Sequence, residues 1–199
     1  MKSKAILHFI TITRHKLLVT RYCFRLGLYT QGLLHDLSKY SPTEFLIGAH
    51  YYQGNQSPNN AERKEKGYSL AWLHHKGRNR HHYEYWIDTN HGAPNGLYCV
   101  EMPVRYVAEM FCDRVAACKI YQKEAYTDGS ALAYFESSKE LLMMNPKTKK
   151  LLEFLLVMLK ERGEAYTFAY IRRRLLGRRF GRSSGTAKGS CRTSKGIRG

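Results

Sequence analysis

Along most of this chain, hydrophobic residues recur at the spacing that places them on one face of an α-helix. The first predicted helix ends at Gly27 and covers residues 4–26. One of its faces carries five regularly spaced positions: His8, Ile12, His15, Val19 and Tyr22. A short second helix is expected over residues 28–39. No segment keeps a period-two alternation between hairpin turns, which argues against a fold built on β-sheets.

The run Ser41-Pro42-Thr43-Glu44 is a helix start, because it combines an N-cap serine, a proline at the first helical position and a capping-box glutamate. Further helices are expected over residues 61–76, 81–87 and 103–123, and from Asn145-Pro146 to Gly163. The glycine- and proline-rich stretch 91–103 is expected to be a loop. The sequence therefore predicts an all-α, single-domain helical bundle.

Basic residues are concentrated at one end of the chain. The 199 residues include 33 Lys+Arg and 16 Asp+Glu, a net charge of +17, and ten of the basic residues lie in 172–199, which has no acid. We expect one domain over residues 1–171 and an Arg/Gly/Ser-rich basic tail over 172–199, disordered from about 177 because it has few large apolar side chains. Such a tail would also bind nucleic acid non-specifically by counterion release.

Several protein classes are excluded or disfavoured by what the sequence lacks. No apolar run approaches the ~20 residues of a membrane span, and the N-terminal stretch does not resemble a signal peptide. The five cysteines form no CxxC pair, which fits a reducing compartment. We therefore expect a cytoplasmic protein without a membrane partner. P-loop, dinucleotide-binding and serine-hydrolase motifs are absent.

Three predicted helices carry polar residues at positions that should be buried. His15 lies on the apolar face of the first helix, and His35 and Asp36 are adjacent in an apolar turn. Asp113 lies in a row with Tyr106, Met110 and Ala117. Burying imidazole and carboxylate groups is costly unless something compensates them, and a divalent cation does so.

Each of these residues also has a plain structural interpretation. His15 would donate a hydrogen bond to a backbone carbonyl, and Asp36 would pair with Lys39, three residues later. Asp113 would pair with Arg114 or with an arginine of another helix. Arg105 and Glu109 are spaced as an ordinary surface ion pair on a different face of the same helix.

Taken together, the order His15, His35-Asp36, Asp113 resembles the HD-domain superfamily of metal-dependent phosphohydrolases. The resemblance implies an all-α bundle in which these four residues bind one or two divalent metal ions (Mn, Fe, Zn, Co or Mg). It also implies that Lys39, which matches the lysine that often follows the His-Asp pair, lies near the substrate phosphate.

Four of the nine histidines are packed into two pairs, His74-His75 and His81-His82. Two-metal members of the superfamily place extra histidines in this interval of the sequence. We expect His75 and His82 to bind metal, with His74 and His81 supporting the site or contacting phosphate together with Arg78 and Arg80. The alternative is a solvated basic patch, because basic residues are interleaved with the histidines.

The function implied by the resemblance is hydrolysis of a phosphoester, with an anionic phosphorylated small molecule or nucleotide as substrate. Asp36 would bridge two metals and orient the attacking water, and Lys39 would neutralise developing charge, as would Arg78 and Arg80. Two alternatives remain open. One is a di-iron oxygenase that uses the same ligands. The other is a non-enzymatic, nucleic-acid-associated accessory protein with a structural metal.

Overall fold

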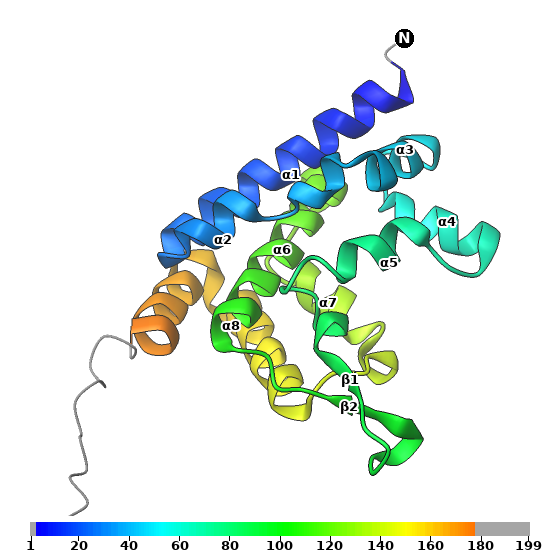
Figure 1. Ribbon diagram of the computed structural model, residues 1–199. Coiled ribbons are helices and arrows are strands. Elements are labelled where there is room, and N and C mark those ends of the chain that lie inside the picture. Colours follow the sequence, from blue (N-terminus) through cyan, green and yellow to red (C-terminus); the bar gives the residue numbers. More distant parts are fainter. Residues whose placement is uncertain (1–2, 178–199) are drawn as a thin grey trace, which may run out of the picture.

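The computed structural model describes residues 3–177 of the chain (Figure 1). Helices dominate this range, and the all-α fold expected from the sequence is confirmed. The α-helices are α1 (Lys4–Leu26), α2 (Tyr29–Leu34), α3 (Pro42–His50), α4 (Pro58–Lys66), α5 (Leu70–Lys76), α6 (Val104–Gln122), α7 (Ser130–Glu136) and α8 (Pro146–Tyr170). Between α5 and α6 the chain forms a small antiparallel hairpin of β1 (Ile87–Thr89) and β2 (Leu97–Cys99).

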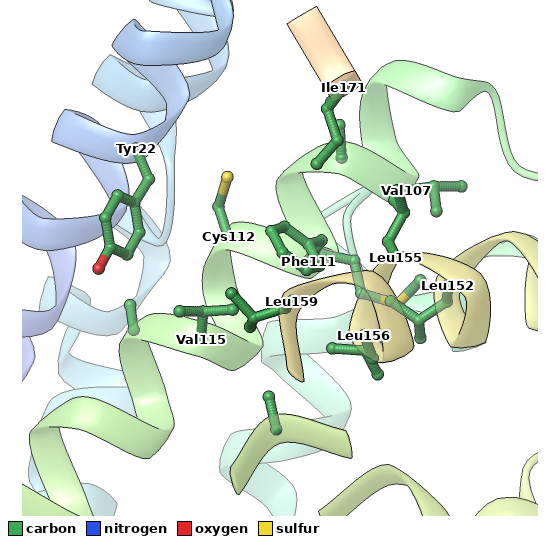
Figure 2. Close-up of a cluster of buried hydrophobic side chains, with 14 of the residues drawn as sticks. Tyr22, Val107, Phe111, Cys112, Val115, Leu152, Leu155, Leu156, Leu159 and Ile171 are labelled. Atoms are coloured by element: carbon green, nitrogen blue, oxygen red, sulfur yellow. The ribbon is translucent and has the colours of Figure 1, made fainter. Parts of the chain in front are cut away.

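The hydrophobic core is centred on α6, against which α1, α7 and α8 all pack. Phe111 of α6 is fully buried against the aromatic ring of Phe168 and the leucines of α8 (Figure 2). These leucines recur at one helical face and are all fully buried: Leu152, Leu155, Leu156 and Leu159. Burial of this apolar surface is the main stabilising contribution to the bundle, and it fixes the position of α6 relative to α1.

Helix α1 has the boundaries and the buried face that its sequence predicts. The Ser3 side chain accepts a hydrogen bond from the Ile6 amide at its start, and Gly27 ends it with a left-handed φ of 80°. Helix α3 approaches α1 closely at Gly48, where an added Cβ would lie 2.3 Å from His8 Nε2. A glycine is therefore needed for this contact, which brings the end of α3 against the first turns of α1.

Four expected elements differ from those observed. The helix expected over 28–39 breaks after Leu34 and resumes as a 3₁₀ turn, η1 (Leu37–Tyr40). The helix expected over 61–76 is divided into α4 and α5, because Gly67 adopts a φ of 80° and Ser69 caps a new helix. Residues 81–87 hold only a 3₁₀ turn, η2 (Tyr83–Trp86). The expected loop over 91–103 contains β2, whose three-residue pairing is too short to show alternation.

Helix α8 continues past its expected end. Gly163 introduces a kink (φ 77°, ψ 172°) instead of a terminus, and the chain then forms a π-helix, η6 (Ile171–Leu176). Leu175 and Leu176 pack on the core, so the helical domain extends beyond residue 171. Residues 178–199, and with them the disorder and nucleic-acid binding expected of the tail, lie outside the described part. Between residues 3 and 177 no helix combines the length and hydropathy needed to cross a bilayer.

Candidate metal centre

The break between α2 and η1 presents His35 and Asp36 to the interior. Lys16 of α1 donates hydrogen bonds to the carbonyl oxygens of Leu33 (2.8 Å) and His35 (2.9 Å), which satisfies the end of α2. Asp36 then adopts a left-handed conformation (φ 54°, ψ 24°), which is uncommon for a residue other than glycine. Adjacent residues of a continuous helix would point in directions 100° apart. Here both side chains are buried, and His35 Nε2 lies 3.3 Å from Asp36 Oδ2.

One group of possible ligands joins α1, the end of α2 and α6. It consists of His15, His35, Asp36 and Asp113, whose ligand atoms all lie within 4.8 Å of one another. Asp113 Oδ1 is 2.9 Å from His15 Nε2 and 3.6 Å from His35 Nε2. The four residues that the sequence singled out are therefore brought together from three helical elements.

A second group lies on the other side of the Asp36 carboxylate. It consists of Asp36, His75, His81 and His82, again with ligand atoms within 4.8 Å of one another. Asp36 Oδ1 is 3.3 Å from His75 Nε2 and 3.4 Å from His81 Nε2, whereas Asp36 Oδ2 faces the first group. Asp36 thus belongs to both groups, with one oxygen directed at each.

The buried nitrogen and oxygen atoms that could bind a metal at this centre lack hydrogen-bond partners among the described residues. The Nε2 atoms of His35, His75, His81 and His82, together with Asp36 Oδ1, are buried and unsatisfied. His15 Nε2 is also unsatisfied, since Asp113 Oδ1 is near it but not in hydrogen-bond geometry. Unpaired buried polar atoms are costly and rare. Their convergence fits a divalent cation, because neutral imidazole and carboxylate groups are ligands for such ions.

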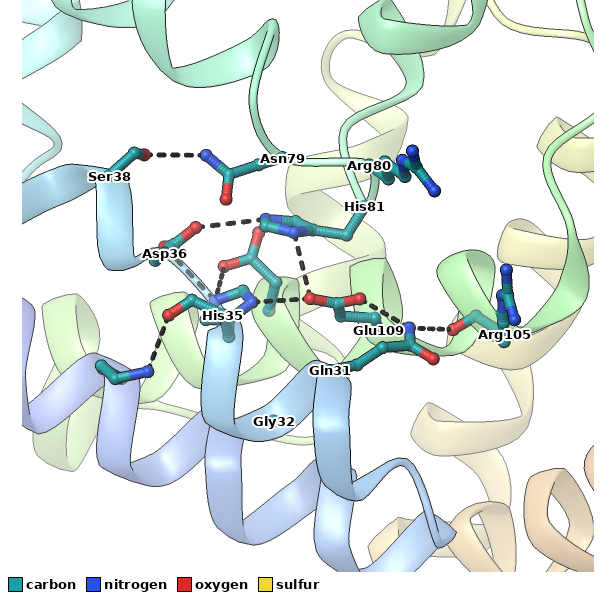
Figure 3. Close-up of polar contacts among 12 residues, drawn as sticks. Gln31, Gly32, His35, Asp36, Ser38, Asn79, Arg80, His81, Arg105 and Glu109 are labelled. Carbon is teal, nitrogen blue, oxygen red and sulfur yellow. Dashed lines mark hydrogen bonds and ion pairs between the residues drawn. The ribbon is translucent and has the colours of Figure 1, made fainter.

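Glu109 of α6 contacts the imidazoles of His35 and His81 at their Nδ1 atoms (Figure 3). Its Oε1 atom is 3.0 Å from His35 Nδ1 and 3.2 Å from His81 Nδ1, and its Oε2 accepts a hydrogen bond from Gln31 at 2.6 Å. Burial opposes ionisation of this carboxyl, but its hydrogen bonds with His35 and His81 lower the pKa of Glu109 to about 2. An ionised Glu109 holds both rings by Nδ1, so that each Nε2 is free for a metal.

Glu44 supports the third imidazole in the same way. It is buried at the start of α3, where the Ser41 hydroxyl accepts a hydrogen bond from its amide. Its Oε2 lies 2.8 Å from His75 Nδ1, and its Oε1 lies 2.6 Å from His74 Nδ1. The Ser41 N-cap was predicted correctly, but the Glu44 side chain contacts His74 and His75. His74 belongs to neither ligand group.

The charges at the centre balance one another. Burial opposes ionisation of Asp36, yet the charges of His35 and Lys39 hold the pKa of its carboxyl well below the usual value. Burial alone would lower the pKa of His35, but Asp36 and its hydrogen-bond partners raise it well above 6.5. Burial and the neighbouring His81 charge lower the pKa of His82, which keeps that ring neutral. The charges of neighbouring groups thus oppose the effect of burial on Asp36 and His35.

The expectation for His81 needs correction: it was expected to support the site, but it points into it beside Asp36. Arg78 and Arg80 are exposed, and Arg78 donates to the His74 carbonyl and Arg80 to the Tyr106 hydroxyl. Their contact with a phosphate stays a prediction. Their place after the end of α5 turns both side chains outward.

Glu109, expected on the surface, is 4% exposed and lies within the site. The signal that could have revealed this is its position four residues before Asp113, which puts both carboxylates on one side of α6. Lys39 forms the local pair with Asp36 that the plain structural interpretation expects, since its Nζ lies 2.5 Å from Asp36 Oδ2. Its contact with a substrate phosphate stays a prediction.

The profile of a family of unknown function (DUF5662) matches residues 4–158, which is more than half of the chain and includes every residue of both ligand groups. No curated protein and no solved structure shows significant similarity. The chain belongs to the DUF5662 family.

Proposed function

We propose that this protein is a metal-dependent phosphohydrolase of the HD-domain type, which acts on a nucleotide or another anionic phosphoester. One observation carries the proposal: the two oxygens of Asp36 face separate sets of buried imidazoles, with the Lys39 ammonium beside one of those oxygens. This arrangement suits two cations bridged by one carboxylate, with the Lys39 ammonium beside them to contact a phosphate.

The donor set narrows the choice of metal. Five imidazoles and two carboxylates are suited to Mn, Fe, Co or Zn, whereas Mg prefers oxygen ligands and retains water. When bound, such ions supply an activated water and a Lewis acid for a phosphoryl oxygen. His15, His35, Asp36 and Asp113 would hold one ion, and Asp36, His75, His81 and His82 the other.

Substrate would enter from the side of Asp113 and Lys39. The side chains of His35, Asp36, His75 and His81 are at most 2% exposed, whereas those of Asp113 and Lys39 are 17% and 27% exposed. Burial would lower the pKa of Lys39, but the charges of Asp36 and Asp113 raise it, so the side chain stays cationic. Lys39 would therefore bind and orient a phosphoryl oxygen at the open side of the site.

The test is phosphate release from nucleotides and from p-nitrophenyl phosphate by the full chain, reconstituted separately with each candidate metal. We expect turnover with at least one metal, and we expect Asp36→Ala to lose bound metal and turnover together. The control is Asp88→Ala, which changes an exposed aspartate on β1. Full activity of Asp36→Ala, or no phosphate release with any metal, would exclude the proposal.

The same experiment distinguishes the alternatives. Two irons per chain in protein purified without added metal, with a charge-transfer band in air and no phosphate release, would favour a di-iron oxygenase. Salt-dependent nucleic-acid binding, without turnover and with no change in melting temperature on chelation, would favour an accessory protein.

A further inference from the structure

The outward face of α1 is hydrophobic. Ile6, Leu17 and Phe24 are 50%, 63% and 38% exposed, and their spacing of 11 and 7 residues places them on one side of the helix. The opposite side buries His15 and packs on the core. Helix α1 thus has two apolar faces, of which the described fold covers only one.

Exposed hydrophobic side chains also occur on the elements that neighbour α1. Leu33, Leu37 and Leu46, from α2, η1 and α3, are 58%, 48% and 65% exposed. The elements join through aromatic contacts, since the ring of Phe24 lies 5.2 Å from that of Tyr29 in α2. We refer to the six side chains Ile6, Leu17, Phe24, Leu33, Leu37 and Leu46 as the N-terminal apolar face. Apolar surface of this kind marks an interaction site.

Positive charge predominates around the N-terminal apolar face. All three carboxyl groups between residues 3 and 64, those of Asp36, Glu44 and Glu62, are at most 5% exposed. The next carboxylate, Glu65, is exposed and lies in a surface hollow with Lys4 near the start of α1. Arg14 and Arg21 are exposed next to the apolar stripe of α1, and neither forms an ion pair with another residue in 3–177. Beyond the start of α1, this face therefore presents these arginines to solvent without a carboxylate paired to them.

Additional positive charge lies at one end of this surface. The π-helix η6 packs against α1, near α2 in Figure 1, and its Arg172, Arg173 and Arg174 are exposed. These arginines add exposed positive charge on an element that packs against α1.

We propose that the N-terminal apolar face binds the surface of an anionic phospholipid bilayer, with α1 lying parallel to it. Helices with exposed leucine and phenylalanine flanked by arginine bind such interfaces through apolar burial and attraction to lipid phosphates. A symmetric contact with a second copy of the chain would place these cations against one another. The expectation of no membrane partner follows from the lack of a spanning stretch or signal peptide in the sequence, whereas exposure of this face follows from the packing. The proposal does not depend on the activity of the metal site.

The experiment is co-sedimentation of the full chain with vesicles of phosphatidylcholine alone and of phosphatidylcholine mixed with phosphatidylglycerol. We expect binding only to the anionic vesicles, and weaker binding at high salt. Leu17→Glu should reduce the affinity by about 10–100-fold, because it replaces an inserted leucine with a charge. Arg14→Gln and Arg21→Gln should each reduce it about fivefold. The matched control is Leu141→Glu, the same change at a leucine that is 83% exposed between α7 and α8.

Two results would overturn the proposal. One is that the chain does not bind anionic vesicles, or binds them equally well after Leu17→Glu. Equal binding by the variant would assign the attraction to another basic segment. The other is a dimer in vesicle-free solution that Leu17→Glu dissociates, which would assign the face to a second copy of the chain. Unchanged thermal melting of Leu17→Glu would show that the variant is folded, as expected for so exposed a side chain.

Discussion

The carboxylate of Glu109 holds the imidazole of His35, with Oε1 3.0 Å from Nδ1. The same oxygen lies 3.2 Å from Nδ1 of His81, so one side chain orients a ring in each ligand group. We expect Glu109→Gln to weaken metal binding by about 10–100-fold, because a neutral amide holds the two rings less firmly. Metal content after dialysis against a graded chelator measures this.

The matched control for Glu109→Gln is Glu101→Gln, which changes an exposed glutamate paired with Lys147. Its metal content should equal that of the unchanged protein. Equal metal retention by Glu109→Gln and Glu101→Gln would show that Glu109 does not position the ligands.

His81 and His74, one from each histidine pair, should differ in their effect on metal content. His81→Ala removes a ring whose Nε2 faces Asp36 Oδ1 and should lower the metal bound per chain. His74→Ala removes a ring that contacts only the outer oxygen of Glu44 and should leave the metal content nearly unchanged. Elemental analysis of both variants checks this. The reverse order of effects would contradict the observed placement of the pairs.

Metal removal should destabilise the fold, because it leaves several buried polar atoms unsatisfied at one point. At a free metal concentration about 100 times Kd, binding adds about 2.7 kcal/mol of stability. For a domain of this size that corresponds to a rise in Tm of about 5–10 °C. Calorimetry with and without a chelator measures the shift. Asp36→Ala serves as the control, since its Tm should not respond to chelation.

Acid should weaken the junction of α1, α6 and α8, where Glu164 contacts Arg25, Lys119 and the Tyr22 hydroxyl. Burial opposes ionisation of Glu164, but Lys119 and Arg25 hold its pKa below the usual 4.5. A lowered folded-state pKa means that this stabilisation is present above about pH 4.5 and is lost as the pH falls further. We expect Glu164→Gln to cost about 1 kcal/mol at pH 7, since the group is partly exposed.

Urea titrations of the two proteins at neutral and acid pH test this prediction. The difference in unfolding free energy should shrink as the pH falls through the folded-state pKa. A difference that is constant with pH would assign the effect to packing.

The parts of the site that lie on long helices could be predicted from sequence. His15 follows the buried stripe of α1, and Asp113 interrupts an apolar row of α6, so helical periodicity alone locates both. Their convergence with Asp36 also required the packing of α1 on α6, which the apolar faces of both helices support.

The parts that depend on turns and on neighbouring helices could not be predicted. Whether His81 or His74 faces Asp36 is set by the chain after α5, where Gly77 to Arg80 break the helix. Glu44 matches a capping box and Glu109 a surface ion pair, so each has a sufficient local explanation. Only the tertiary structure shows that both side chains reach imidazoles on other elements.

The ligands also determine when the centre can form as the chain folds. His15 and Asp113 lie far apart in the sequence and meet only after α1 has packed on α6, so the complete set of ligands exists only once these two helices are together. Contacts between distant segments form late, after their loop-closure entropy has been offset by other contacts. A cation captured at that stage would leave the rate of folding nearly unchanged and act mainly by slowing unfolding.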